Sequence, residues 1–454
     1  MSFSVRRFLF SILFLAGMLL ASYFAMNGFA KSAKQVNFKL AKIFPADVQS
    51  AVTFDQSIIA NLLISSAQGR PMVIVPNSNG TLTALDGKTG ALEWQVTVPT
   101  PEGQEAQLVS TPVKIGNKLV IVYQCLEKSV RTSHRMVVLD LAEQQFDESF
   151  PVLVLTAEKP TADGTGIVKF NPPTAFSHSA LKHTWKIGTE WGLVYAAFGN
   201  AGDTQPFHGW LFEIDMDAWH RQGTDQAISS VLLTTPEAEC PVTIESGTQE
   251  MICGGGIWTP AGPQLYPTND SHELIVPVGN GQVDLARRDY ANTLMRVQPG
   301  LEFDPECDGN LCKNFNPSQP DSACIASCKN LFIPRLAQEN TPLKPANGEC
   351  DSKSYWECLA WMDYDLGASA PIKASLHSGQ NVLVQPSKDG AVFLIDADHL
   401  GTQYDRMQIA DVCGTTSDPC KAGWMGMIVT QPALTYINGD PVVVVPTFMP
   451  DTTH

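Results

Sequence analysis

Residues 79–94 read Asn-Gly-Thr-Leu-Thr-Ala-Leu-Asp-Gly-Lys-Thr-Gly-Ala-Leu-Glu-Trp. Leu82 and Ala84 alternate with polar residues in the first half of this stretch. Residues 87–90 are turn formers, after which Leu92 and Trp94 resume the alternation. Alternation with a period of two is typical of strands, and a short Gly-rich link between two such runs is typical of a tight turn. The stretch therefore predicts a β-hairpin.

Degenerate copies of this hairpin recur downstream, each with a strand that ends in an apolar–acidic or an apolar–apolar pair. They occupy residues 135–141, 208–215, 290–297 and 388–396. Apolar runs at 119–123, 193–198, 274–278 and 382–385 predict the matching inner strands. Helical periodicity is nearly absent after the N-terminus. Short, repeated strands with Gly and Pro between them predict an all-β fold, and the repeat favours a β-propeller over a sandwich.

The pattern Gly-x-Leu-x-Ala-Leu-Asp-x-x-Thr-Gly-x-x-x-Trp at 80–94 resembles the repeat of the pyrroloquinoline quinone (PQQ) propellers, in the quinoprotein alcohol dehydrogenase-like superfamily. This resemblance implies four-stranded blades in a seven- or eight-bladed ring. Five units are marked by Leu85, Leu139, Ile214, Val297 and Ile395, and residues 442–445 begin a sixth. Two interpretations stay open: the sequence is an incomplete version of a longer protein, or a strand near Val52 closes the last blade.

The N-terminus predicts export. Arg6 and Arg7 precede an apolar run at 8–26, and the small residues Gly28 and Ala30 follow it. This is the layout of a signal peptide cleaved after Ala30, although the run is also long enough for an uncleaved membrane anchor. The predicted organisation is therefore a signal peptide or anchor at 1–33, a propeller at 45–454 and a cysteine-rich insertion at 304–357. The expected location is the periplasm or the cell envelope.

The formal net charge of −16 argues against two classes of partner. An acidic chain without clusters of Lys and Arg is repelled by nucleic acids and by anionic membrane surfaces. We therefore expect neither as a partner.

The eleven cysteines favour disulfides, because exported proteins fold in an oxidising compartment. Nearest-neighbour pairing is the simplest of the possible connectivities for the six cysteines of the insertion, which are Cys307, Cys312, Cys324, Cys328, Cys350 and Cys358. Two further local pairs are Cys240 with Cys253 and Cys413 with Cys420. Cys125 is then the odd thiol, buried in a strand. The spacings do not match zinc sites, which typically have two residues between paired cysteines.

Four segments resemble the cofactor site of the quinoprotein dehydrogenases. Residues 254–258 resemble the Gly-Gly-x-x-Trp element that places a tryptophan, here Trp258, under the quinone ring. Residues 278–281 resemble the Gly-Asn element whose amide, here Asn280, ligates calcium. Residues 363–371 resemble the segment of the catalytic aspartate, here Asp365. Residues 388–396 resemble the strand whose basic residue, here Lys388, reaches the quinone oxygens.

The resemblance implies that Trp258, Asn280 and Lys388 bind PQQ, that Asn280 and Asp365 ligate calcium, and that Asp365 and Lys388 are catalytic. These roles have a physical basis. PQQ is a flat polyanion, which suits a tryptophan face and a cation. Calcium takes oxygen ligands, and a carboxylate near a substrate hydroxyl accepts its proton while hydride passes to the quinone.

The sequence also departs from the family. It has no adjacent Cys-Cys pair, which covers the other quinone face in many alcohol dehydrogenases. The acidic calcium ligand expected from an earlier blade has only a positional candidate, Asp203. Each site residue also has an ordinary structural interpretation: a blade-packing aromatic, a turn, a cap or a hairpin.

Two functions are therefore compatible with the sequence. The first is an exported oxidoreductase that uses PQQ and calcium to oxidise an alcohol or a sugar. The second is a non-catalytic propeller scaffold that binds protein or polysaccharide partners in the cell envelope. The ordered set of four segments favours the first.

Overall fold

The computed structural model describes residues 54–67, 70–200, 207–236, 244–245, 248–249, 254–268, 271–281, 283–316, 320–334, 364–409 and 427–447. All of them belong to the second of two compact units, Val52–His454. The predicted signal peptide or anchor, Val52 and Asp203 lie outside the described residues. Within the described part of the chain, no helix has the length and apolarity that a membrane crossing requires.

The stretch at 79–94 forms the predicted hairpin, made of β3 (Thr81–Asp86) and β4 (Leu92–Thr97). Asp86 closes its turn, because Oδ1 accepts the backbone N–H groups of Lys88 at 2.9 Å and Thr89 at 2.7 Å. Two preceding strands complete an antiparallel sheet in the order β1-β2-β3-β4, namely β1 (Leu63–Ala67) and β2 (Arg70–Pro76).

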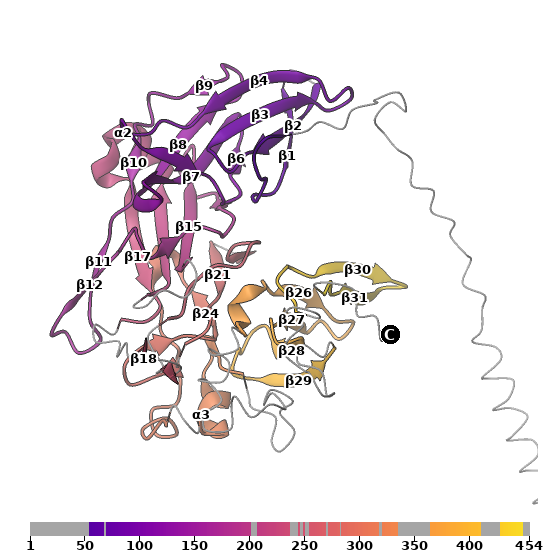
Figure 1. Ribbon diagram of the computed structural model, residues 1–454. Helices are drawn as coiled ribbons and strands as arrows, with labels where there is room; N and C mark the ends of the chain where they lie inside the picture. Colours follow the sequence, from indigo (N-terminus) through magenta and orange to yellow (C-terminus); the bar gives the residue numbers. More distant parts are fainter. Residues whose placement is uncertain are drawn as a thin grey trace, which may run out of the picture. The chain divides into compact units, whose positions relative to one another are not determined.

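Further antiparallel sheets follow in chain order (Figure 1). The second contains β5 (Glu105–Gln107), β6 (Val113–Ile115), β7 (Lys118–Glu127), β8 (Val130–Asp140), β9 (Gln145–Phe146) and β10 (Leu153–Val154). The third contains β13 (Ala175–Phe176), β14 (Lys182–Thr184), β15 (Leu193–Asn200), β16 (Trp210–Asp215) and β17 (Ile228–Leu233). The fourth contains β20 (Gln264–Pro267), β21 (His272–Pro277), β24 (Leu294–Val297) and β25 (Leu331–Phe332).

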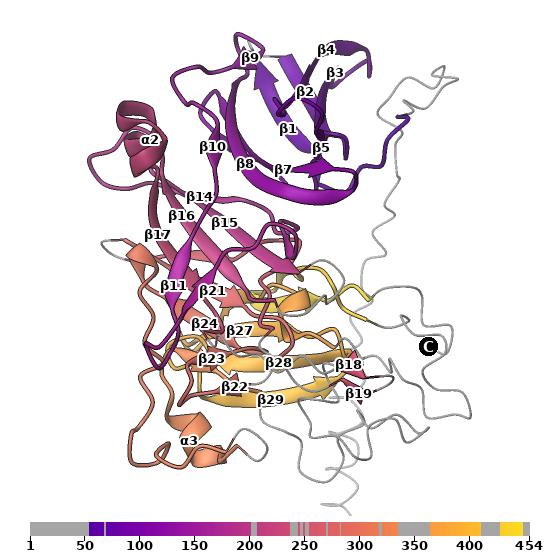
Figure 2. The same ribbon diagram turned by 60° about the vertical axis from the view of Figure 1, so that its left-hand side comes forward.

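The fifth sheet has the order β26-β27-β28-β29, and Figure 2 shows its strands lying alongside one another. It contains β26 (Ile372–Ser375), β27 (Asn381–Pro386), β28 (Ala391–Asp396) and β29 (Gln403–Gln408). A hairpin follows, made of β30 (Ala433–Ile437) and β31 (Asp440–Val444). The other described ribbons pair β11 (Glu158–Pro160) with β12 (Ile167–Lys169), β18 (Ile244–Glu245) with β19 (Thr248–Gln249), and β22 (Val283–Asp284) with β23 (Asp289–Tyr290). Short helices are α2 (Met216–Gln222), α3 (Ser322–Ser327) and the 3-10 turns η1 (Thr224–Gln226), η2 (Pro299–Leu301) and η3 (Leu366–Ala368).

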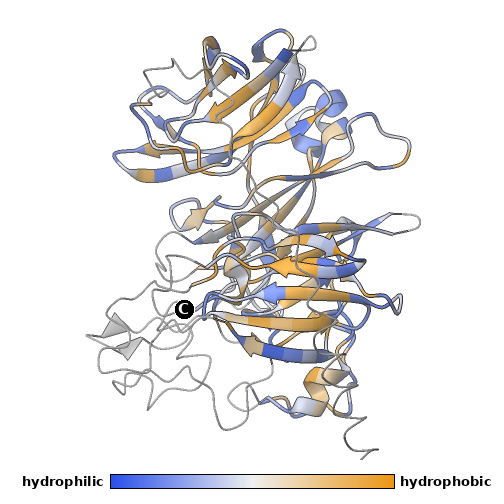
Figure 3. Ribbon diagram, turned by 90° about the vertical axis from the view of Figure 1, so that its right-hand side faces the viewer, coloured by the Kyte–Doolittle hydropathy of each residue, from blue (hydrophilic) through white to orange (hydrophobic). Residues whose placement is uncertain are grey.

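Successive sheets pack face to face, as the alternation along β7 shows. Leu119 and Ile121 enter the core shared with the first sheet, while Val120 and Val122 enter the core shared with the third. Neighbouring side chains of a strand point to opposite faces, so a strand with both faces covered is apolar throughout. Figure 3 shows this as hydrophobic colour along the strands. The structure confirms an all-β fold, and three of the five larger sheets among the described residues have the four strands predicted for a propeller blade.

One predicted strand is interrupted. The segment predicted at 290–297 divides into β23 and β24, and Asn292 between them has a left-handed φ of 55°. Asparagine tolerates this conformation better than most residues. The break lets the Asn292 side chain leave the sheet and contact a neighbouring loop, described below.

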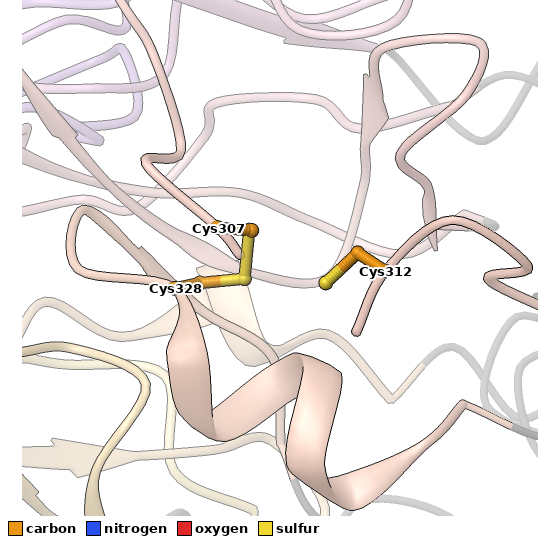
Figure 4. Close-up of side chains that lie close together, drawn as sticks. All are labelled: Cys307, Cys312 and Cys328. Atoms are coloured by element: carbon orange, nitrogen blue, oxygen red, sulfur yellow. A yellow bond between two sulfur atoms is a disulfide. The ribbon is translucent and has the colours of Figure 1, made fainter. Parts of the chain in front are cut away.

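The cysteine-rich insertion has a different connectivity from the predicted one. One disulfide joins Cys307 to Cys328 (Figure 4). Another joins Cys312 to Cys324, so nearest-neighbour pairing is wrong here. Helix α3 explains the difference. Cys324 and the C-cap residue Cys328 are four residues apart, which places both on the same face of the helix. Both therefore meet the preceding loop, which carries Cys307 and Cys312. Cys125 is free and buried in β7, as predicted. The other predicted pairs, Cys240–Cys253, Cys350–Cys358 and Cys413–Cys420, lie outside the described residues.

Peptide mapping of the unreduced protein should therefore recover nested rather than sequential links. After digestion under non-reducing conditions, mass spectrometry is expected to find the Cys307 peptide joined to the Cys328 peptide. The Cys312→Ser, Cys324→Ser variant is the matched control, because it should keep that link. Recovery of a Cys324–Cys328 link within one peptide would contradict the nested connectivity.

Candidate functional site

The four predicted site residues flank equivalent inner hairpins of two successive sheets. Trp258 precedes β20 and Asn280 follows β21. Asp365 precedes β26 and Lys388 follows β27. In an antiparallel pair, the residue before the first strand and the residue after the second lie at the same end. The repeat therefore brings segments that are far apart in the sequence to one end of neighbouring sheets.

Glycines fix the loop that carries Trp258. Gly254 and Gly255 have φ values of 76° and 71°, which favour glycine. A Cβ on Gly254 would lie 2.5 Å from the carbonyl oxygen of Asn280. The Gly255 N–H donates to that same oxygen at 2.8 Å. The absence of side chains thus allows the loop to dock on the residues that follow β21.

Asp365 is held by the backbone of that same region. Its Oδ1 accepts the backbone N–H of Asn280 at an N···O distance of 2.5 Å. The next residue, Leu366, donates its N–H to Oδ1 of Asn292 at 2.8 Å. Asn292 in turn donates its N–H to the carbonyl of Gly279 at 2.6 Å. The interrupted strand therefore positions the aspartate.

Lys388 lies in the turn between β27 and β28, and its backbone N–H donates to the carbonyl of Asp365 at 3.1 Å. Its Nζ lies 3.6 Å from Oδ2 of Asp365, and both side chains are only 4% exposed. The same Nζ lies 5.2 Å from the centre of the Trp258 ring. A buried ammonium, a buried carboxylate and a half-buried indole thus meet at one point.

His178 also joins the site, although no motif predicted it. Its Nδ1 lies 3.1 Å from the carbonyl oxygen of Trp258. Gln385 was missed as well; its Nε2 donates to the carbonyls of Leu366 at 3.0 Å and Ser369 at 3.1 Å. The His178 contact joins residues 80 apart in the sequence, and the Gln385 contacts join β27 to the segment before β26. No local spacing in the sequence signals either of them.

Calcium ligation by Asn280 and Asp365 stays a prediction, and the described donor set does not fit the ion. Calcium takes about six to eight oxygen ligands. The described site offers one carboxylate, which already faces the Lys388 ammonium and an N–H group. Among the described residues, the one group with three metal-ligating side chains is Cys307, Cys312 and Cys328, all in disulfides.

The described residues do fit a planar anion such as PQQ. Trp258 offers a half-buried aromatic surface beside the positive charge of Lys388. Gly279 lets both side chains pack closely on its backbone, because a Cβ there would lie 2.8 Å from Oδ1 of Asp365 and 3.2 Å from Nε1 of Trp258. Trp258 and Lys388 are the residues that would hold the cofactor.

Comparisons with known proteins find likeness at the level of structure. No family model and no curated protein sequence matches the chain. A quinohemoprotein alcohol dehydrogenase, ADHIIG from Pseudomonas putida HK5, matches 85% of this chain at 12% identity and a TM-score of 0.36. The chain spans 62% of that protein's length.

Two other structures give a similar result. BamB from Moraxella catarrhalis matches 87% of this chain and 74% of its own, at 12% identity and a TM-score of 0.34. A europium-containing methanol dehydrogenase matches 84% of this chain and 73% of its own, at 10% identity and a TM-score of 0.34. The chain resembles PQQ-type propeller proteins in its repeat. Identities this low say nothing about the site, whose chemistry follows from the chain's own residues.

Proposed function

We propose that the protein is an exported, PQQ-dependent oxidoreductase that oxidises an alcohol or a sugar. The observation that carries this proposal is the meeting of Lys388, Asp365 and Trp258 at one buried point. Oppositely charged side chains buried next to an aromatic surface are typical of functional sites, although structural ion pairs share the feature. Calcium is left out of the proposed chemistry, because the described donors do not fit it.

Each residue has a distinct part in the proposed reaction. Trp258 and Lys388 would hold the planar anionic cofactor, which would supply a two-electron acceptor when bound. The Lys388 ammonium would offer it a positive charge. Asp365 accepts the proton of the substrate hydroxyl through Oδ2, because its Oδ1 is held by the Asn280 N–H. The substrate is a small molecule, and no nucleic acid is part of the proposal.

A non-catalytic scaffold is the second candidate, favoured by the near-complete burial of the Lys388–Asp365 pair. Buried pairs with backbone hydrogen bonds also serve to hold loops in place. In this case the propeller would bind protein or polysaccharide partners in the cell envelope, and the pair would join two sheets without contacting a ligand.

Titration with PQQ separates the two functions. We expect saturable quenching of tryptophan fluorescence in the wild type and turnover of an alcohol or a sugar with an artificial electron acceptor. Asp365→Asn should bind PQQ but lose about 100-fold or more in turnover, because an amide cannot accept the proton. The exposed Asp405→Asn is the matched control and should be unaffected. A folded wild type that binds no PQQ would favour the scaffold.

A further inference from the structure

We propose that Arg131, Phe176 and His178 form a carbohydrate subsite beside Trp258, which makes a sugar, rather than a simple alcohol, the ligand of this site. As a substrate site this inference rests on the proposed function. The binding of sugar itself does not require PQQ, so the two can be tested separately.

A row of side chains leads from the surface to the buried ion pair. The guanidinium carbon of Arg131 lies 5.1 Å from the centre of the Phe176 ring. The Phe176 and His178 rings are within 9° of parallel, with centres 5.9 Å apart. The centre of the His178 ring lies 6.2 Å from that of Trp258, which adjoins Lys388. The four side chains of the row before Lys388 are all half-buried, so the row is reachable from solvent. They are Arg131, Phe176, His178 and Trp258.

His178 offers a hydrogen-bond acceptor to this row. The carbonyl oxygen of Trp258 can only accept, so Nδ1 of His178 carries the proton in the bond between them. Burial lowers the pKa of His178, which keeps the ring neutral at pH 7. The lone pair of the neutral ring is therefore on Nε2, which can accept a hydrogen bond from a hydroxyl group.

Some buried polar atoms without a hydrogen-bond partner belong to residues that adjoin this row in the sequence or in the sheet. Ser177 Oγ, Thr259 Oγ1 and both amide atoms of Asn200 are buried and have no hydrogen-bond partner. Ser177 follows Phe176, Thr259 follows Trp258, and Asn200 pairs with Ala175 across β13 and β15. Ser177 and Thr259 are 1% and 0% exposed. Native proteins contain few such groups, and each one calls for a polar partner.

These features together describe the chemistry of a sugar site. Aromatic side chains pack against the apolar faces of a pyranose ring, and a few fixed polar groups bind its hydroxyls. A sugar presents both an apolar ring face and several hydroxyl groups, which suit an aromatic row that carries a hydrogen-bond acceptor on His178. A simple alcohol presents one. The row thus provides a reason for a polyhydroxylated ligand.

The test is a titration of the PQQ-free protein with D-glucose, maltose and ethanol, followed by intrinsic tryptophan fluorescence. We expect saturable binding of a sugar and none of ethanol. Phe176→Ala should raise the dissociation constant about tenfold, and Phe176→Tyr should restore it, since Tyr keeps the ring. Phe146→Ala removes another half-buried ring, outside the row, and is the matched control.

Each outcome decides the proposal. No saturable sugar signal, or equal dissociation constants for Phe176→Ala and Phe146→Ala, would overturn it. PQQ binding with turnover of ethanol but not of sugars would overturn it and leave the oxidoreductase standing. Sugar binding without any PQQ binding would support the subsite and overturn the proposed oxidoreductase.

Discussion

Lys388→Met is expected to lower the free energy of unfolding by about 3–5 kcal/mol. The substitution keeps the length of the side chain but leaves the Asp365 carboxylate without its cation, in a site where both partners are 4% exposed. A buried charge that loses its partner costs far more than the pair contributes. The variant should also lose PQQ binding, because no other ammonium contacts Trp258 within the described part of the site.

Urea denaturation of two comparison variants isolates this effect. Lys329→Met removes an ion pair with Glu306 whose side chains are 53% and 49% exposed, and should cost less than about 1 kcal/mol. Adding Asp365→Asn to Lys388→Met removes both charges and should recover most of the lost stability. If Lys388→Met were no more destabilising than Lys329→Met, the two side chains would not form a buried pair.

The sheets were predictable because strand formation depends on local pattern. Alternation and turn residues at 79–94 define β3 and β4, and apolar runs define β7, β15, β21 and β27. Burial on both faces turns these inner strands into uniform apolar runs, which the sequence displays directly. The interruption at Asn292 was not predictable, because it depends on a contact with Leu366 in η3, which is distant in the sequence.

The sequence motifs singled out four residues that lie close together, but not the contacts between them, and their cofactor and catalytic roles stay predictions. Four short motifs identified Trp258, Asn280, Asp365 and Lys388, and the structure brings all four together. The motif assigned the amide of Asn280 to a metal, whereas its backbone N–H contacts Asp365. His178 was missed because it reaches Trp258 from another sheet. The predicted disulfide pairing was wrong because it depends on helix α3. The sequence of this short helix has no strong apolar period, so the helix was not predicted.

Gly367→Ala should disrupt both the fold and the site, because two loops approach each other closely at Gly367. A Cβ on Gly367 would overlap the backbone nitrogen of Gly279 and the carbonyl carbon of Val278. Backbone atoms in a packed core cannot yield as a flexible side chain does, so η3 must shift away from β21. We expect a loss of about 3 kcal/mol in stability, at the upper end of the usual cost of overpacking.

The shift should also separate Asp365 from the Asn280 N–H and abolish PQQ-dependent quenching, even under conditions where the variant remains folded. Gly309→Ala is the matched control, because a Cβ there meets no atom within 4 Å. Thermal melts followed by circular dichroism and PQQ titrations below the melting temperature measure the two effects independently. A Gly367→Ala protein with wild-type stability and wild-type PQQ binding would show that η3 does not pack on β21, and that the carboxylate is positioned by some other contact.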